Sequence, residues 1–275
     1  MSIFACPVCR ERLEKLEKEY ACPNGHHYDL ASEGYVYLLQ PNKKHSKMPG
    51  DDRQMVASRR RFLEGGSYRI FSDELNRLAL KCLPKEGADI LDAGCGEGYY
   101  TGRLAAFLEE QGVSAEIAGF DISKFAVKAA AKKYKSISFA VGSMFSIPVL
   151  DASADLVINV FAPIVPEELA RSVKPGGFLI LAIPSERHLF GLKQILYDSP
   201  YENEHRETDY PGFLFRERVP VRGNISTSDT QTIQDLFSMT PYFWKTPKEG
   251  CERLKQTQTL ETEIGFDFLV YRRQD

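Results

Sequence analysis

The chain has 275 residues, of which 43% are hydrophobic and 27% are charged, and its formal net charge is −3. These values are typical of an ordinary soluble globular protein, and the length accommodates one substantial α/β domain with a small appendage. The apolar N-terminus is too short for a signal peptide, and no apolar run approaches the roughly 20 residues of a membrane-spanning helix, so we expect a cytoplasmic protein.

The first 40 residues are rich in cysteine. Cys6-Pro-Val-Cys9 is followed by Cys22-Pro-Asn-Gly-His26, so three of the six cysteines fall within the first 22 residues. Three thiolates and one imidazole are the ligand set of a closed, structural zinc site. The spacing also admits His27 as the fourth ligand, and we choose His26. Buried cysteines or a redox pair are the alternatives, but nothing nearby resembles a thioredoxin-type pattern.

A basic stretch follows at residues 41–62, which we expect to link the cysteine-rich module to the rest of the chain. Between residues 43 and 61, seven Lys and Arg residues stand against two acidic residues. They are Lys43, Lys44, Lys47, Arg53, Arg59, Arg60 and Arg61. Such residues can hold a phosphate backbone independently of sequence, but a solvated charged linker fits the composition equally well. Apolar positions in residues 68–83 then predict an amphipathic helix.

From residue 88 onward strands and helices alternate, which predicts a parallel sheet with helices on both faces. The predicted strands cover residues 89–92, 116–120, 138–141, 156–161 and 178–183, and the predicted helices cover 100–110, 124–134 and 166–173. After Pro184 we expect a helix over 188–197, a polar loop through 210, a strand over 213–220, a helix over 228–239 and a strand near 266–271. We therefore divide the chain into a module at 1–40, a basic linker and helix at 41–83, and an α/β domain at 84–275.

A glycine-rich turn follows the first predicted strand. Asp92 precedes Gly94-Cys-Gly96-Glu-Gly98, and a helix begins just after. A dinucleotide fingerprint would place its third glycine where this chain has Tyr99, so the loop differs from that motif. It resembles instead the first motif of class I S-adenosylmethionine (SAM)-dependent methyltransferases, with Gly94 and Gly96 approaching the cofactor and Asp92 available to its cationic amino-acid part.

Three further landmarks follow in the same order as in those enzymes. Asp121 ends the second predicted strand, where a carboxylate can accept both ribose hydroxyls. Gly142-Ser-Met144 follows the third strand, where adenine contacts often fall, and Val173–Gly177 precedes a strongly apolar strand. A glycine-rich turn without a ligand is the plain alternative, and four landmarks in order favour the methyltransferase interpretation over it.

The whole pattern resembles the RlmA family of bacterial 23S rRNA guanine-N1 methyltransferases. The resemblance rests on the cysteine motifs, Pro49-Gly-Asp51, Arg59–Leu63 and Leu91–Thr101, and it extends over almost the full length. It implies a Rossmann-like catalytic domain behind a zinc-ribbon-like module, and a guanine in a hairpin of domain II of 23S rRNA as the substrate. It also implies zinc ligation by Cys6, Cys9, Cys22 and His26. Implied cofactor contacts lie far apart in sequence, at Tyr68, Tyr100, Thr101, Asp121 and His188.

The segment Asn159-Val-Phe-Ala-Pro163 follows the fourth predicted strand, where such enzymes hold the target base. It lacks the Asn-Pro-Pro-aromatic motif of exocyclic-amine methyltransferases, which is consistent with a ring-nitrogen target. Phe161 fits either a base-stacking role or a buried core position, and no residue is assigned as the general base.

Two other functions stay open at this stage. One is a small-molecule methyltransferase, against which the zinc module and the basic stretch argue. The other is a non-catalytic RNA-binding factor of ribosome assembly, against which the intact Asp92, glycine loop and Asp121 argue. A homodimer is also left open.

Overall fold

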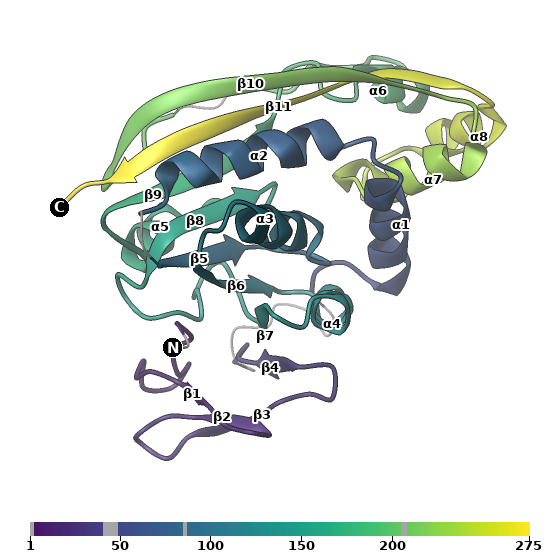
Figure 1. Cartoon of the computed structure of the whole chain (residues 1–275). Helices are drawn as coiled ribbons and strands as arrows, with labels where there is room; N and C mark the ends of the chain where they lie inside the picture. The colour runs from purple at the N-terminus through teal and green to yellow at the C-terminus, as the bar shows by residue number, and fades with distance from the viewer. Residues whose placement is uncertain (1–2, 41–48, 85–86, 205–207) are drawn as a thin grey trace.

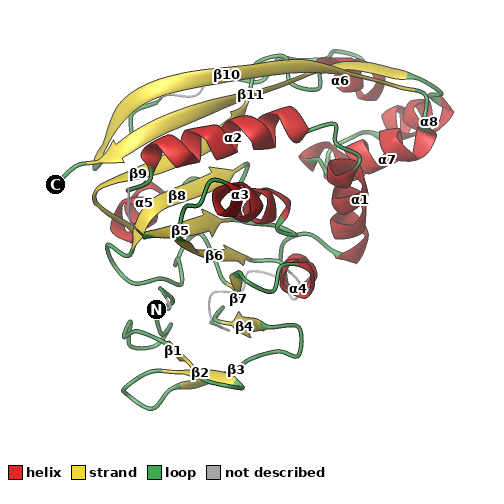
Figure 2. Ribbon diagram, viewed as in Figure 1, coloured by secondary structure: helices red, strands yellow, loops and turns green. Residues whose placement is uncertain are grey.

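The computed structural model describes residues 3–40, 49–84, 87–204 and 208–275. Its large sheet has the strand order β10-β11-β9-β8-β5-β6-β7-β4, and a small antiparallel sheet has the order β1-β2-β3 (Figures 1 and 2). The small sheet consists of β1 (Glu14–Lys15), β2 (Glu19–Ala21) and β3 (His27–Asp29). The large sheet consists of β4 (Tyr35–Tyr37), β5 (Ala88–Ala93), β6 (Ala115–Asp121), β7 (Ser138–Val141), β8 (Ala154–Val160), β9 (Val173–Pro184), β10 (Phe213–Thr227) and β11 (Leu260–Arg273).

Helices alternate with these strands over most of the chain. They are α1 (Arg53–Glu64), α2 (Arg69–Cys82), α3 (Tyr99–Glu110), α4 (Lys124–Lys133), α5 (Pro166–Ser172), α6 (Phe190–Leu196), α7 (Thr230–Ser238), the 3-10 helix η2 (Pro241–Trp244) and α8 (Lys248–Gln256). In the described part of the chain, no helix is both long and apolar enough to cross a membrane.

The predicted doubly wound α/β architecture is confirmed. Strands β4 to β9 are parallel to their neighbours, whereas β11 lies antiparallel between β9 and β10. One face of the central strands, carrying Ile90, Leu156 and Ile180, is buried with apolar side chains of α2, α3 and α6. Since parallel strands end at one edge, the loops after β5, β6, β8 and β9 meet there, beside α1 in Figure 1.

The N-terminal module packs against the opposite face of the sheet through the connection between β7 and β8. Phe4 forms an antiparallel bridge with Val149, and the N–H of Ala5 donates to the carbonyl of Pro148 at 3.0 Å. Strand β4 extends this contact, because it pairs with β7 as the edge strand of the large sheet. The division expected at residue 40 therefore assigns one strand of the main sheet to the N-terminal module.

Helix α1 begins at Arg53 and so occupies the second half of the basic stretch at residues 41–62, which we expected to be a linker. Asp52 caps it by accepting hydrogen bonds from the N–H groups of Gln54 and Met55. The helix packs against α4 and α7, and Arg61 forms a bidentate pair with Asp235 at 2.6 and 2.8 Å. Sequence periodicity missed this helix because arginines cover much of its surface, and the partner of Arg61 is a carboxylate 174 residues away.

Strands β10 and β11 are much longer than predicted. We expected strands over 213–220 and near 266–271, whereas the two strands pair antiparallel from Phe213 to Thr227. Most of β10 is exposed at the sheet edge, so its sequence lacks the apolar alternation of a half-buried strand. Helix α8 was missed for a similar reason, since it buries only Gly250 and Leu254.

Candidate cofactor site and metal centre

The glycine loop between β5 and α3 has the left-handed backbone that its glycines permit. The φ angles of Gly94, Gly96 and Gly98 are +88°, +55° and +84°. A Cβ on Gly94 would lie 2.3 Å from the Cβ of Ala162, so only glycine lets the segment after β8 come this close. The loop thus presents bare backbone at the carboxyl end of β5, as a bound nucleoside requires.

Asp121 lies at the end of β6 directly beside this loop. One of its carboxylate oxygens accepts a hydrogen bond from the N–H of Gly96 at 3.0 Å, and the other accepts one from the N–H of Ser123 at 2.8 Å. Burial raises its pKa, although the two N–H donors act to lower it. Each oxygen keeps a lone pair, so the carboxylate can still accept two ribose hydroxyls.

Asp92 and Thr101 form a second buried polar pair beneath the loop. The Thr101 hydroxyl donates to the Asp92 carboxylate at 2.5 Å, and both side chains are almost fully buried. Burial raises the pKa of Asp92 to about 7, the Thr101 hydrogen bond opposes this rise, and the nearby Asp121 charge adds to it. A cationic ligand group beside Asp92 would favour its ionised form, so the pair fits the amino-acid end of SAM.

His188 and Tyr68 come together although they are 120 residues apart in the chain. The Nδ1 atom of His188 accepts a hydrogen bond from the N–H of Gly265 at 3.1 Å, and Nε2 lies 3.3 Å from the Tyr68 hydroxyl. The neutral ring therefore carries its proton on Nε2 and donates it to Tyr68. Burial, with the charges of Lys193 and Arg222, lowers the pKa of His188 to about 3.

The remaining implied cofactor residues occupy different environments. The Tyr100 hydroxyl is buried and has no hydrogen-bond partner among the described residues. Buried polar groups are normally satisfied, so this hydroxyl is suited to a bound polar ligand. Met144 lies in the turn after β7, 6% exposed, with its side chain in the apolar cluster that also holds Phe120. These positions support a site at the carboxyl edge, whereas direct cofactor contact stays a prediction.

Arg59 and Asp51 are site residues that we missed in the sequence. Their side chains form an ion pair at 2.8 Å, and Arg59 also donates to the carbonyl of Met239 at 3.1 Å. A guanidinium nitrogen of Arg59 lies 3.6 Å from where a Cβ on Gly96 would be, so α1 lies over the glycine loop. Both residues belong to motifs of the family resemblance, which was the available signal.

The described half of the basic stretch is engaged within the chain. Arg59 pairs with Asp51, Arg60 pairs with Glu64 at 3.2 Å, and Arg61 pairs with Asp235. Arg53 lies over the ring of Phe125, 5.0 Å from its centroid. Lys43, Lys44 and Lys47, on which the predicted RNA contact also depends, lie outside the described residues.

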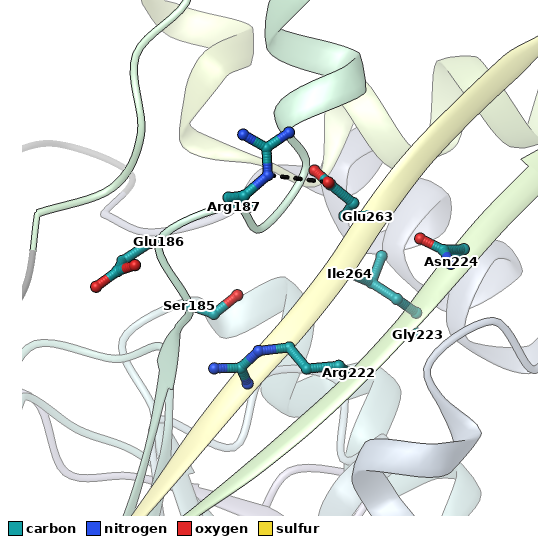
Figure 3. A pocket seen from close by; sticks show the side chains of 8 residues that line it. All are labelled: Ser185, Glu186, Arg187, Arg222, Gly223, Asn224, Glu263 and Ile264. Carbon is teal, nitrogen blue, oxygen red and sulfur yellow. Dashed lines mark hydrogen bonds and ion pairs between the residues drawn. The ribbon is translucent and has the colours of Figure 1, made fainter.

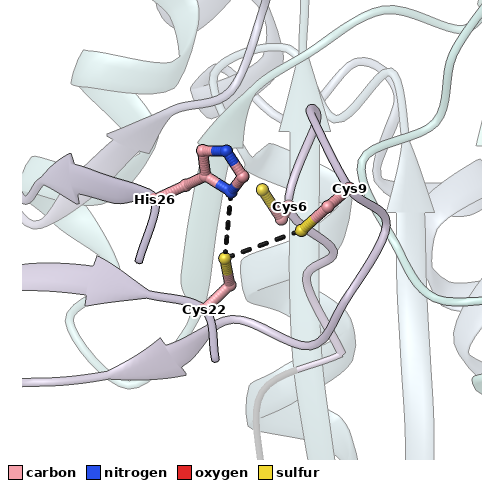
Figure 4. A group of neighbouring side chains, drawn as sticks. All are labelled: Cys6, Cys9, Cys22 and His26. Atoms are coloured by element: carbon pink, nitrogen blue, oxygen red, sulfur yellow. Dashed lines mark hydrogen bonds between the residues drawn. The ribbon is translucent and has the colours of Figure 1, made fainter. Parts of the chain in front are cut away.

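The predicted metal ligands converge in the N-terminal module (Figure 4). The ligand atoms of Cys6, Cys9, Cys22 and His26 all lie within 4.8 Å of one another. The sulfur atoms of Cys9 and Cys22 are 3.6 Å apart, and Nδ1 of His26 lies 3.3 Å from the Cys22 sulfur. Tetrahedral zinc with Zn–S bonds of about 2.3 Å would hold neighbouring sulfurs ~3.8 Å apart, so the cluster fits this ion.

Neighbouring groups decide which histidine can be the fourth ligand. The Nδ1 atom of His27 lies 3.1 Å from a Glu19 carboxylate oxygen, and its side chain is 57% exposed, away from the cluster. The Glu11 backbone N–H is the main cause of the lowered pKa of Cys9, about 6, which favours the thiolate that binds metal. The choice of His26 over His27 therefore agrees with the geometry.

The segment after β8 presents Phe161 at the carboxyl edge of the sheet. Its φ is +60°, which is rare outside glycine, and its side chain is 46% exposed. Asn159 holds the turn by accepting from the N–H of Ala162 and donating to the carbonyl of Pro163, both at 3.2 Å. The Phe161 ring lies 5.8 Å from the ring of His188 and 4.4 Å from that of Phe266. The partly exposed ring favours the base-stacking interpretation over a core role.

Comparison with known proteins identifies both halves of the chain. A family model described as "RlmA, N-terminal" matches residues 4–47, and a methyltransferase-domain model matches residues 84–234. YxjB of Bacillus subtilis (strain 168), provisionally named a 23S rRNA (guanine-N(1)-)-methyltransferase, is 32% identical, over 98% of this chain and 96% of its own. The 23S rRNA (guanine(748)-N(1))-methyltransferase of Streptomyces fradiae is 34% identical, over 70% of this chain and 66% of its own.

A solved structure from Bacillus halodurans C-125, titled as a methyltransferase, superposes with a TM-score of 0.50 at 14% identity, covering 74% of this chain and all of that one. At this identity the likeness concerns the class I fold alone. The similarity to YxjB carries the assignment further, because its 98% coverage of this chain includes the ribbon and the catalytic domain together. The chain therefore belongs to the RlmA family of SAM-dependent 23S rRNA (guanine-N1)-methyltransferases.

Proposed function

We propose that this chain transfers a methyl group from SAM to N1 of a guanine in a hairpin of domain II of 23S rRNA, in the cytoplasm. The observation that carries the proposal is the similarity to YxjB over 98% of the chain, which includes the ribbon as well as the catalytic domain. A general small-molecule methyltransferase domain would account for the second part only.

The cysteine cluster is proposed to hold one structural zinc ion. Four protein ligands close the tetrahedron and leave no position for a reacting water, which distinguishes this site from a catalytic one. The module's small sheet buries few side chains, so the ion would supply much of its stability. The folded ribbon then fixes β4 beside β7, and with it the edge of the catalytic domain.

Residues of the carboxyl edge are proposed to hold SAM, which supplies a methyl group activated by its sulfonium. Asp121 would accept the ribose hydroxyls, and Asp92 would face the amino group of the methionine part. Tyr68 and Tyr100 would bind the polar atoms of the same part with their buried hydroxyls. Neutral His188 would orient Tyr68, because its Nε2 proton is donated to the Tyr68 hydroxyl and leaves the phenolic proton available.

Phe161 is proposed to stack on the target guanine after that base leaves the RNA helix. In the transfer, N1 would lose its proton to water and its electron pair would form the bond to the methyl carbon, while the carbon–sulfur electron pair would stay on the sulfur of the departing S-adenosylhomocysteine. The stacked ring would align N1 with the methyl group, which is the main requirement for this displacement. The rigid turn from Asn159 to Pro163 keeps the ring in place.

Methylation of a domain II transcript, with nucleosides analysed by mass spectrometry, tests this proposal. The wild type should form N1-methylguanosine, and Phe161→Ala should lower kcat/KM for RNA by about tenfold, since stacking contributes about 1–3 kcal/mol per base. Its affinity for SAM should not change. Leu214→Ala, an exposed apolar residue at the opposite end of the sheet, is the matched control. Methylation of another nucleotide, or of none, would contradict the proposal.

A further inference from the structure

A pocket of about 400 Å³ opens beside the proposed target site and belongs to none of the cofactor or metal positions described above. Its walls come from the segment after β9, from the C-terminal part of β10 and from the N-terminal part of β11 (Figure 3). The polar lining residues are Ser185, Glu186, Arg187, Arg222, Asn224 and Glu263. The volume lies in the range of about 300–1,000 Å³ that is typical of small-ligand sites.

A single glycine separates this pocket from His188. A Cβ on Gly265 would lie 2.2 Å from the Ser185 hydroxyl and 2.9 Å from the side chain of Arg222, both of which line the pocket. The N–H of the same glycine donates to His188, whose ring packs beside Phe161. The pocket thus adjoins His188, whose ring is in turn next to the Phe161 ring.

The wall formed by residues 185–187 is held rigidly from behind. Asn203 donates its side-chain amide to the carbonyl of Ser185 and its backbone N–H to the carbonyl of Glu186, both at 2.7 Å. The ammonium of Lys193, a fully buried side chain, donates in turn to the Asn203 side chain at 2.8 Å. Lysine is rarely buried without such partners, so this network gives the pocket a preorganised wall.

The charged groups of the pocket are also fixed in position. Arg222 pairs with the buried Asp267 at 2.6 Å and donates to the carbonyl of Phe266 at 2.8 Å. Arg187 donates to Glu263 across the pocket at 2.9 Å. Asp267 thus neutralises Arg222, and Glu263 and Glu202 neutralise Arg187, so this charge balance disfavours a bare phosphate as the ligand.

Asn224 gives the pocket its recognition group. Its side chain is exposed in the pocket and has no hydrogen-bond partner among the described residues. A carboxamide offers a donor and an acceptor side by side, which matches the edge of a nucleobase. Fixed arginine and glutamate groups around it provide further donors and acceptors of the kind that a base edge requires.

We propose that this pocket binds the base of the nucleotide adjacent to the methylated guanine, with Asn224 reading its edge. The inference rests on the proposed function, because it takes RNA as the substrate. The pocket thereby selects which guanine of the hairpin enters the active site, since a guanine with the wrong neighbour would leave Asn224 and Arg222 without the base edge.

The test compares Asn224→Ala and Asn224→Asp with the wild type, using a transcript of domain II of 23S rRNA. Ser226→Ala is the matched control, because Ser226 is exposed two residues further along the same strand and does not line the pocket. We expect both Asn224 variants to bind the labelled transcript about tenfold more weakly by fluorescence anisotropy, with a similar loss in kcat/KM. Their affinity for SAM should equal that of the wild type.

The outcomes separate the two proposals. If the wild type forms N1-methylguanosine and the Asn224 variants match Ser226→Ala, the pocket assignment is overturned and the proposed function stands. If binding depends on Asn224 but no N1-methylguanosine forms, Asn224 contacts RNA, but the proposed reaction and the placement of the pocket beside a methylated guanine are both wrong. A wild type that does not bind the transcript overturns both. In two separate transcripts, an abasic unit replaces the base on one side or on the other side of the target guanine. The difference in binding between the wild type and the Asn224 variants should disappear with only one of these transcripts.

Discussion

His188 should make the stability of this protein depend on pH in a way that one substitution removes. The side chain is nearly fully buried, and its Nδ1 accepts the Gly265 N–H. Its pKa is about 3 in the folded protein and about 6.5 in an unfolded chain. Below pH 6.5 the unfolded state therefore binds a proton that the native state does not bind. The free energy of unfolding consequently decreases as the pH is lowered.

The size of this effect follows from the pKa difference. Each pH unit inside the window is worth about 1.4 kcal/mol, so His188 alone removes roughly 3 kcal/mol between pH 7.5 and pH 4.5. Asp92 acts in the opposite direction, because its pKa is raised to about 7 and its protonation relieves a buried charge. The pH dependence of the wild-type stability thus contains contributions from both His188 and Asp92. The wild type must therefore be compared with a variant that lacks only the imidazole.

His188→Asn is that variant, because its amide oxygen can replace Nδ1 as the acceptor for Gly265 and does not titrate. Urea unfolding followed by circular dichroism at both pH values gives the free energies. The advantage of the wild type over the variant should shrink by roughly 3 kcal/mol from pH 7.5 to pH 4.5. A difference in the free energy of unfolding between the wild type and the variant that is the same at both pH values would refute the buried, neutral imidazole. It would also refute the hydrogen-bond assignment that depends on the neutral imidazole.

Three further predictions concern the cofactor, the metal and α1. Asp121→Asn should weaken SAM binding at least about 100-fold by calorimetry, because charged hydrogen bonds are worth about 1.5–3 kcal/mol each and two ribose contacts are lost. Glu116→Gln, at an exposed site on the same strand, is the control. Equal SAM affinities of the two variants would contradict the assignment of Asp121. Elemental analysis should find one zinc ion per chain. The double variant Cys9→Ser/Cys22→Ser should lose the zinc together with much of the stability of the protein. Native protein without metal would disprove the site. Arg61→Ala should cost about 1–3 kcal/mol in thermal unfolding, since it leaves Asp235, 4% exposed, with Gln231 as its remaining side-chain donor among the described residues. Arg69→Ala, which removes an exposed ion pair, should have no effect. Equal melting temperatures for these two variants would show that the pair with Asp235 does not hold α1.

Features that are local in the chain were readable from the sequence. The glycine loop, the end of β6 at Asp121 and the two cysteine knuckles each depend on a few neighbouring residues with strict geometric needs. Gly94, for example, is required by the close approach of Ala162, and its motif is visible without knowledge of that contact. The order of such motifs was enough to predict the α/β architecture.

Features that depend on distant partners were not readable in this way. Helix α1 is fixed by Arg61 and Asp235, which are 174 residues apart, so its arginines resemble a solvated linker in the sequence. The pocket beside His188 is likewise built from three separate segments of the chain. Its recognition group, Asn224, lies on an exposed strand whose polar pattern gave no signal of a site.

Reverse transcription across 23S rRNA tests the central claim most directly, because a methyl group on guanine N1 blocks Watson–Crick pairing and stops the polymerase. RNA from the organism that carries this chain should show a stop in the domain II hairpin, and the stop should vanish when the gene is deleted. Wild-type protein should restore it, whereas Asp121→Asn should not. A stop that persists in the deletion strain would contradict the assignment of this chain as the enzyme that methylates that guanine.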